Sequence, residues 1–281
     1  MSVDLPKPDW LKTQLTPAAD YHNLKKKFIS HSLNTICESG SCPNRAECWS
    51  RGTATFMILG DVCTRSCRFC SVKTGTPAPV DFLEPIHVAE VVKQMQLKHC
   101  VLTSVTRDDL EDGGAQIWKQ TVIEIRNQNP GITIETLIPD FDGRTENILD
   151  LLSAKPEIVA HNLETVPRLT ETIRVHAKYN ISLDVIRMIA DYGLKAKSGL
   201  MVGLGETDDE VFQTIKDLQK NKCAVLSIGQ YLRPTKEHYP VQRYVTPEMF
   251  DEYRQFALKC GISHVESSPL VRSSFHSELH L

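Results

Sequence analysis

Two groups of three closely spaced cysteines constrain this chain more than any other feature of its sequence. Six of its nine cysteines lie between Cys37 and Cys70, and the other three are spread over the remaining residues. The count is odd, and at 281 residues the chain is far longer than the small secreted domains that disulfides hold together. Its first ten residues, MSVDLPKPDW, match neither a secretory signal nor an Arg-rich transit peptide. Grouped thiols in a chain of this kind indicate metal binding in the cytoplasm.

The balance of charges excludes several classes of protein. The chain has 32 basic and 35 acidic side chains and a formal net charge of −3, which argues against a nucleic-acid binder that works through bulk electrostatics. Its apolar runs are far shorter than the roughly 20 residues that a membrane-spanning helix needs. We therefore expect a cytoplasmic protein with no nucleic acid and no membrane among its partners.

The second cysteine group, Cys63, Cys67 and Cys70, has the spacing C-x3-C-x2-C and directly follows a predicted strand. Three thiolates on one short loop can hold three irons of a 4Fe-4S cluster and leave the fourth iron open, whereas an electron-transfer cluster would use four cysteines. A zinc loop is the alternative, but such loops prefer paired C-x2-C hooks with four ligands. The motif resembles the signature of the radical S-adenosylmethionine (SAM) superfamily, and Phe69 occupies that family's usual aromatic position.

The first group, Cys37, Cys42 and Cys48, has the spacing C-x4-C-x5-C. Taken alone, it is compatible with a zinc knuckle or with three unrelated thiols, because no fourth cysteine lies nearby. The three remaining cysteines fall within strand or helix patterns, and we predict that they pack in the core. They are Cys100, Cys223 and Cys260.

Short β-rich runs alternate with helical patterns from about residue 53 onward. Six runs predict strands, at residues 55–59, 99–104, 132–137, 157–161, 195–202 and 224–229. Repeated strand–helix alternation indicates a parallel sheet with helical crossovers. Six units are too few for a complete eight-stranded barrel, so we expect an α/β fold with a partial (β/α)6 TIM-like barrel at residues 53–268. The active site of such a barrel lies at the carboxyl edge of its strands.

Capping signals predict several helix ends. Thr145 is a candidate N-cap, and Thr207 with Glu210 forms a capping box. Thr246, followed by proline, opens a last helix that Gly261 would close.

Taken together, these segments resemble the lipoyl synthase family. The N-terminal triplet, the C-x3-C-x2-C motif and a terminal Arg272-Ser273-Ser274-Phe275 segment carry the resemblance. Further matching segments extend along nearly the whole chain, at residues 107–110, 112–115, 161–166, 197–201, 203–207 and 229–235. Two positions depart from the family pattern, with Thr106 where Asp is frequent and Phe275 where Tyr is usual. Neither departure removes a cluster ligand.

The resemblance implies insertion of two sulfur atoms, at carbons 6 and 8 of an octanoyl chain carried on a lysine of a lipoyl carrier domain. These carbons are unactivated, so the reaction requires a radical that a cofactor supplies. The implied cofactors are SAM and two 4Fe-4S clusters, of which the auxiliary cluster on the N-terminal triplet serves as sulfur donor. The implied partners are octanoylated E2 subunits of 2-oxoacid dehydrogenases or the glycine cleavage H protein, and an electron donor such as ferredoxin or flavodoxin.

The resemblance also implies residues that hold SAM. Gly113 and Gly114 could approach its ammonium with backbone carbonyls, while Asn162, Glu164 and Arg174 are further candidates. Arg174 has the fork geometry to bind a carboxylate. The alternatives are a surface arginine for Arg174 and a helix N-terminal acid for Glu164.

The end of the chain is implied to complete the auxiliary site. Ser274 is the expected fourth ligand of the auxiliary cluster, with Ser273 as the second choice, and Arg272 would seat the tail or the substrate carbonyl. In this interpretation residues 1–52 form an extension that carries the auxiliary triplet, and residues 269–281 form a tail that closes over it. Without the resemblance, a frayed polar terminus would be expected.

Three other functions compete with this interpretation. Biotin synthase shares the sulfur-insertion chemistry but has neither the N-terminal triplet nor the Arg-Ser-Ser tail. A radical methylthiotransferase would need a larger N-terminal domain than the 62 residues before Cys63 allow. A zinc-binding interaction module explains the cysteines but not a three-thiol loop at a barrel edge. Iron and sulfide contents of about eight each per chain would separate a two-cluster enzyme from a zinc protein.

Overall fold

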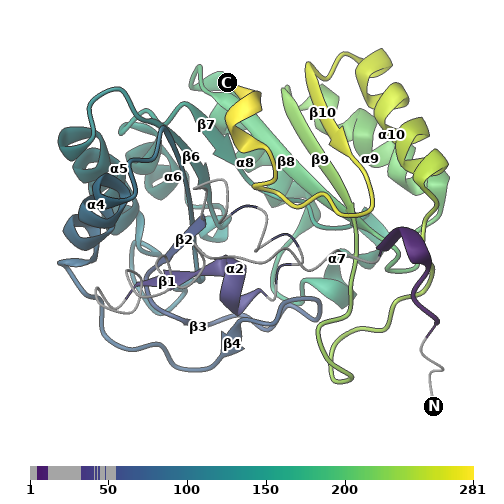
Figure 1. Ribbon diagram of the computed structural model, residues 1–281, viewed down its shortest axis with the longest axis horizontal. Coiled ribbons are helices and arrows are strands. Elements are labelled where there is room, and N and C mark those ends of the chain that lie inside the picture. The colour runs from purple at the N-terminus through teal and green to yellow at the C-terminus, as the bar shows by residue number, and fades with distance from the viewer. Residues whose placement is uncertain (1–4, 12–32, 41, 43, 45–47, 49–54) are drawn as a thin grey trace.

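The computed structural model describes residues 5–11, 33–40, 42, 44, 48 and 55–281 (Figure 1). Most of the predicted N-terminal extension, residues 1–52, lies outside this described part. The described chain builds one large sheet with helices packed on its outer face (Figure 1).

The sheet has eight strands in the order β1-β2-β5-β6-β7-β8-β9-β10. β1 (Asn34–Thr35) pairs antiparallel with β2 at one edge, and every other pairing in the sheet is parallel. Six parallel strands coincide with the predicted runs: β2 (Thr55–Ile58), β5 (His99–Ser104), β6 (Thr133–Leu137), β7 (Ile158–Ala160), β8 (Lys195–Val202) and β9 (Val225–Gln230). The short, polar β10 (His264–Ser267) lies beside β9 and leads into the tail. The prediction of a partial α/β barrel is therefore confirmed.

Seven helices follow the parallel strands. They are α4 (Glu84–Gln94), α5 (Ala115–Gln128), α6 (Thr145–Leu152), α7 (Pro167–Ile173), α8 (Tyr179–Asp191), α9 (Asp208–Lys220) and α10 (Pro247–Cys260). The smaller elements are η1 (Asp9–Leu11), α2 (Ile36–Ser39), β3 (Val62–Cys63), β4 (Lys73–Thr74), η2 (Phe141–Gly143) and η3 (Ser277–His280). No helix of the described residues is long and apolar enough to cross a membrane.

The helix ends test the capping predictions. The Thr207 side chain accepts the Glu210 N–H, and the Glu210 carboxylate accepts the Thr207 N–H, so the predicted capping box is confirmed. Thr246 caps α10, and Gly261 ends it with φ 102°. The prediction for Thr145 is wrong, because the N-cap of α6 is Arg144 and Thr145 is already helical. The preceding η2 turn feeds directly into α6, which starts the helix one residue earlier than predicted.

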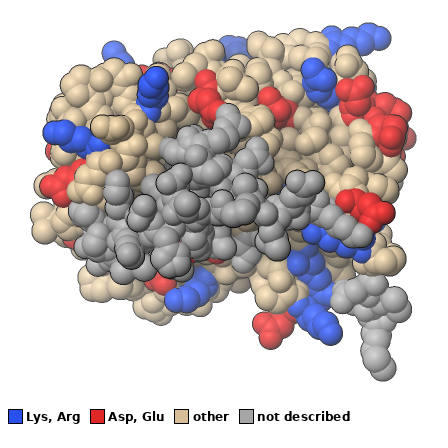
Figure 2. Space-filling view, in the orientation of Figure 1, with Lys and Arg blue, Asp and Glu red and all other residues tan. Residues whose placement is uncertain are grey.

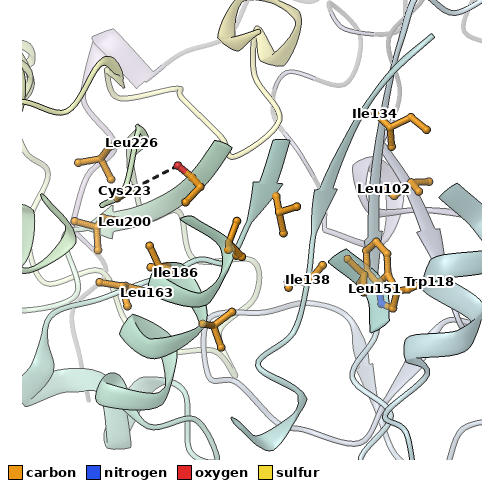
Figure 3. Close-up of a cluster of buried hydrophobic side chains, with 14 of the residues drawn as sticks. Leu102, Trp118, Ile134, Ile138, Leu151, Leu163, Ile186, Leu200, Cys223 and Leu226 are labelled. Carbon is orange, nitrogen blue, oxygen red and sulfur yellow. Dashed lines mark hydrogen bonds between the residues drawn. The ribbon is translucent and has the colours of Figure 1, made fainter. Parts of the chain in front are cut away.

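A continuous apolar core lies between the sheet and the helices. Trp118, Leu151 and Ile186 are fully buried on their helices and face apolar side chains of the strands (Figure 3). Cys100 and Cys223 are buried as predicted, and Cys260 is partly buried against the same core. This core fixes the strand ends that carry the polar residues described below.

Polar side chains lie on the other face of the sheet, where the C-terminal tail packs. Lys197 of β8 and Glu135 of β6 form an ion pair of 2.6 Å in which both side chains are almost completely buried. The Lys197 Nζ is also 3.1 Å from Nδ1 of His280, and Lys195 donates to the His280 carbonyl over 2.9 Å. η3 therefore docks against β8 (Figure 1), and the alternative of a frayed terminus is wrong for these residues.

Candidate functional site

The C-x3-C-x2-C loop begins at the carboxyl end of β2, after a tight turn. Leu59 and Gly60 form this turn with φ values of 68° and 97°. The Leu59 N–H donates to the Glu84 carboxylate over 2.7 Å, and the Leu59 carbonyl accepts a hydrogen bond from the buried Arg107 guanidinium over 3.2 Å. The N–H and the carbonyl of Leu59 are thus both held by buried ionisable side chains, which fixes the direction in which the loop to Cys63 leaves the barrel.

Cys63 is held through its sulfur. Its Sγ accepts the backbone N–H of Arg65 at 3.4 Å and that of Thr106 at 3.3 Å. Hydrogen bonds to a cysteine sulfur tune the reduction potential of an iron–sulfur cluster that it binds. Because Thr106 makes this contact with its backbone, the contact does not require the Asp that is frequent in the family at this position.

Cys67 and Cys70 lie deeper in the barrel mouth. Burial raises the pKa of the Cys67 thiol to about 12, and the pKa of Cys70 to about 11. The Cys67 Sγ is 4.0 Å from the Arg174 carbonyl, and the charges of Glu164 and Arg174 both act on this thiol. The cysteine loop and two of the predicted SAM residues are therefore brought together.

Arg65 anchors the first half of the cysteine loop, and the sequence analysis missed it. Its buried guanidinium binds Asp108 after β5 and Asp140 after β6, each at 2.8 Å. These two carboxylates raise the pKa of Arg65 further, although burial opposes this, so the guanidinium stays charged. The sequence feature that could have identified Arg65 is its position, as a charged residue between Cys63 and Cys67.

Asn162 and Glu164 follow β7 at the same edge. The Asn162 Nδ2 donates to the Glu164 Oε1 over 3.0 Å, and Glu164 has φ 64°. The Glu164 N–H donates to the Gly199 carbonyl, while its own carbonyl accepts the Met201 N–H. Glu164 is thus held beside β8 before α7 begins, and the alternative of a helix N-terminal acid is wrong.

Arg174 ends α7 and is only 6% exposed. Its Nη1 donates to the Ser182 Oγ over 2.8 Å and to the Leu163 carbonyl over 3.3 Å. The alternative of a surface arginine is therefore wrong. A cationic fork is fixed beside Cys67 and Glu164.

The remaining predicted cofactor residues lie elsewhere around this edge. Gly113 lines a cavity of about 270 Å³ together with Arg65 and Thr106. Gly114 has φ 87°, and a Cβ added there would come within 2.5 Å of the Leu59 side chain. Gly114 therefore allows α5 to pack against the turn before the cysteine loop. Phe69 is partly buried against the hydrophobic core.

The N-terminal triplet lines a second site. The side chains of Cys37, Cys42 and Cys48 border one small pocket, to which the tail contributes Arg272 and Ser274. The Thr35 hydroxyl accepts the Cys37 N–H and caps the short α2. The Asn44 amide donates to the Leu270 carbonyl over 2.7 Å and so joins the N-terminal segment to the tail. The structure thus brings together all three thiols and both tail residues that the sequence assigned to the auxiliary site.

The two tail serines face different groups. The Ser273 Oγ accepts a hydrogen bond from the Asn162 Nδ2 at 2.7 Å, on the side of the predicted SAM residues. Ser274 lines the pocket of the N-terminal triplet. The tail therefore reaches both the predicted SAM residue Asn162 and the pocket of the N-terminal triplet.

The full length of the chain matches proteins of one family. The sequence is 54% identical to a lipoyl synthase of Flavobacterium johnsoniae over 98% of this chain and 96% of that protein. It is 53% identical to a lipoyl synthase of Parabacteroides distasonis over 100% of both chains. A mitochondrial lipoyl synthase of Nematostella vectensis is 52% identical over 98% of this chain and 95% of its own length.

The chain belongs to the lipoyl synthase family. In agreement, the model of the radical SAM superfamily matches residues 57–218. The protein is therefore a radical SAM enzyme that inserts sulfur, with a 4Fe-4S cluster and SAM as cofactors. The biotin synthase and methylthiotransferase alternatives are wrong.

Two solved structures of other proteins share the fold of this chain. Methylornithine synthase gives a TM-score of 0.56 at 12% identity, over 87% of this chain and 77% of that chain. The FeFe-hydrogenase maturase HydG from Carboxydothermus hydrogenoformans gives 0.58 at 12% identity, over 92% and 78%. At this identity the likeness concerns the fold alone.

The spacing of the thiols separates clusters from single metal ions. Within the part of the chain that the structure describes, one set of three metal-binding side chains has ligand atoms that all lie within 4.8 Å of one another, namely His264, Glu266 and His280. Neither cysteine triplet has this close spacing, which a tetrahedral zinc ion requires. The match to the radical SAM superfamily and to lipoyl synthases is what argues against the zinc-binding module.

Proposed function

We propose that this protein converts a carrier-bound octanoyl-lysine to lipoyl-lysine by inserting sulfur at carbons 6 and 8, using two 4Fe-4S clusters. One observation carries the two-cluster proposal. The pocket of Cys37, Cys42, Cys48 and Ser274 is a second thiol site whose lining includes none of the cysteines of the Cys63 loop.

The residues of the barrel mouth suit the binding of a 4Fe-4S cluster together with SAM. When bound, the cluster on the Cys63 loop supplies the electron that cleaves SAM into the hydrogen-abstracting radical. Burial raises the pKa of both Cys67 and Cys70, so these thiols are protonated without the cluster and would release their protons on binding iron. Arg174 would bind the carboxylate of SAM, and Glu164 with Asn162 would hold its polar groups from the β7 side.

The residues of the N-terminal pocket suit a cluster that gives up sulfide as a substrate. Three thiolates would hold three irons, and the Ser274 hydroxyl would be the fourth ligand. A serine oxygen is a harder ligand than thiolate and a poorer match for an iron–sulfur centre, so its iron is the easiest to release. The side chain of Arg272 lines the same pocket, where its charge would offset that of the cluster.

The expected partners follow from the same assignment. The substrate is an octanoylated lipoyl carrier domain of an E2 subunit or of the glycine cleavage H protein, and a ferredoxin or flavodoxin would supply electrons. The proposed location is the cytoplasm, where the thiols that hold iron–sulfur clusters stay reduced.

An anaerobic assay with an octanoylated carrier domain tests the proposal. The reconstituted protein should add two sulfur atoms to the carrier by mass, and free octanoic acid should turn over far more slowly. Replacing Cys63, Cys67 and Cys70 by Ala should abolish SAM cleavage. Replacing Cys37, Cys42 and Cys48 by Ala should leave cleavage measurable and abolish sulfur insertion. Lipoyl product from the second triple variant would overturn the sulfur-donor assignment.

Ser274→Ala and Ser273→Ala form a matched pair for the tail. Ser274→Ala should retain SAM cleavage and lose sulfur transfer by about 10-fold or more, as expected for an altered metal site. Ser273→Ala should instead weaken the contact with Asn162 and affect the SAM side. The reverse pattern would show that Ser273 is the cluster ligand.

A further inference from the structure

We propose that residues 233–239 clamp the second half of the cysteine loop, and that His238 is a positioning residue for the radical-generating cluster through the carbonyl of Cys70. The inference rests on the assignment of that cluster to Cys63, Cys67 and Cys70. It does not depend on the sulfur-donor role of the auxiliary site.

The contact between His238 and Cys70 has a defined direction. The His238 Nε2 is 3.0 Å from the Cys70 carbonyl oxygen. A carbonyl only accepts hydrogen bonds, so Nε2 carries the proton and donates it. The His238 Nδ1 is 2.8 Å from the Thr235 Oγ1, and in a neutral imidazole that donates from Nε2 it accepts the hydroxyl proton. Both ring nitrogens are thus engaged, which fixes the orientation of the imidazole.

The next residue binds the same loop. The Tyr239 N–H donates to the Arg68 carbonyl over 2.9 Å, and the Arg68 guanidinium lies over the Tyr239 ring, 5.1 Å from its centroid. Two consecutive residues of the clamp therefore bind two carbonyls of the cysteine loop, one on each side of Phe69.

The clamp is itself fixed to the end of β9. The Tyr231 hydroxyl donates to the Tyr239 carbonyl over 2.7 Å, and the Arg233 Nε donates to the His238 carbonyl over 2.9 Å. β9 lies far across the sheet from β2, which carries the cysteine loop. The clamp thus bridges the mouth of the partial barrel between strands that do not pair.

The second half of the loop depends on this bridge more than the first. Arg65, Thr64 and Cys63 are tied to the β5 and β6 ends by several hydrogen bonds and two ion pairs. Within the described chain, the backbone of residues 67–70 is otherwise held by the Arg68 N–H on the Ile173 carbonyl and by one internal turn. The clamp therefore supplies two of the few described hydrogen bonds that hold the backbone carrying Cys67 and Cys70.

The test compares His238→Ala with His238→Gln in the reconstituted holoenzyme. Glutamine can place an N–H donor near the position of Nε2, whereas alanine cannot. We expect His238→Ala to change the part of the reduced EPR spectrum that responds to SAM, to lose cluster iron faster to a chelator and to lower SAM cleavage about 10- to 100-fold. His238→Gln should recover most of each property.

Two further results decide the matter. Thr235→Val keeps the imidazole but removes the hydroxyl that orients it, and it should give a smaller change of the same kind, even if His238→Ala fails to fold. Wild-type EPR, iron retention and SAM cleavage in His238→Ala and Thr235→Val would overturn the proposal. None of these readouts requires lipoyl product, so they stay informative if the sulfur-donor assignment fails.

Discussion

At the scale of single residues, the position of the cysteine loop depends on the lack of a side chain at Gly114. Gly114 lies so close to Leu59 that a Cβ would come within 2.5 Å of its Cδ1. Leu59 in turn begins the turn that aims the loop, with its N–H on Glu84 and its carbonyl on Arg107. A methyl group at Gly114 would therefore press on the base of the cysteine loop.

Gly114→Ala should destabilise the protein more than Gly131→Ala. Both glycines have positive φ, 87° and 83°, but a Cβ at Gly131 meets nothing within 4 Å. The backbone cost of about 1–2 kcal/mol is common to both, and overpacking adds about 1–3 kcal/mol at Gly114 only. Urea unfolding of the cluster-free protein measures the difference. Equal free energies of unfolding would show that Leu59 moves aside without cost.

At the scale of elements, the buried pair of Lys197 and Glu135 joins β8 to β6 across the intervening β7. Each charge has lost its water, so removing one partner leaves the other uncompensated. Burial raises the pKa of Glu135, and the attraction of Lys197 opposes this shift. The same lysine contacts His280, so the pair also holds η3 in place.

Lys197→Met should therefore lower the free energy of unfolding by about 3–5 kcal/mol. The double variant Lys197→Met with Glu135→Leu should recover most of this loss, because no buried charge remains. Lys222→Met is the surface control, since its pair with Asp191 is exposed and should contribute less than about 1 kcal/mol. Denaturant titrations at pH 7.5 give all three values. A double variant as unstable as the single one would show that the ion pair is needed for more than charge balance.

Elements that depend on local patterns were predictable from the sequence. The capping box of Thr207 and Glu210, the stop at Gly261 and the six predicted strands all use residues within a few positions of one another. Thr145 was misplaced because the preceding η2 turn, which the sequence analysis did not predict, decides where α6 begins. The Lys197–Glu135 pair could not be predicted, because it depends on the order and register of three strands.

At the scale of the whole molecule, three buried histidines make the fold sensitive to acid. Burial lowers the pKa of His99 and His161 to about 4, and that of His280 to about 3. Burial and the nearby charge of Arg174 lower the pKa of His161, although its Nδ1 donates to the Ile138 carbonyl over 2.9 Å, a contact that opposes this shift. The folded state therefore resists protonation that the unfolded chain accepts below pH 6.5.

The cluster-free protein should accordingly lose stability as the pH falls from 6.5 towards 4. In this window the unfolded state binds more protons, so each histidine removes up to about 1.4 kcal/mol per pH unit. Unfolding by urea at a series of pH values measures the slope. His161→Gln should reduce it by one histidine's share, whereas the exposed His176→Asn should leave it unchanged. An equal slope in His161→Gln would mean that other groups set the acid limit.

In the candidate site, too, features with local sequence spacing were predicted and contacts between distant segments were not. Both cysteine triplets and the tail motif were found because their spacing is local. The sequence analysis did not predict two contacts, between Arg65 and Asp140 and between His238 and Cys70. Each joins segments that are distant in the sequence and meet only in the folded sheet. Cluster ligands that lie close together in the sequence could therefore be predicted, whereas the long-range contacts that orient them could not.

The contact between Asn44 and Leu270 has a consequence for how the protein matures. These residues are 226 positions apart, whereas the strands from β5 to β9 pair with their neighbours in chain order. Contacts that close long loops form late in folding. We expect a transient species with a formed barrel but undocked ends, in which pulsed alkylation still labels Cys37, Cys42 and Cys48 after the core amides are protected. The time between formation of the barrel and docking of the two chain ends would then be the interval in which the N-terminal triplet can receive iron and sulfide.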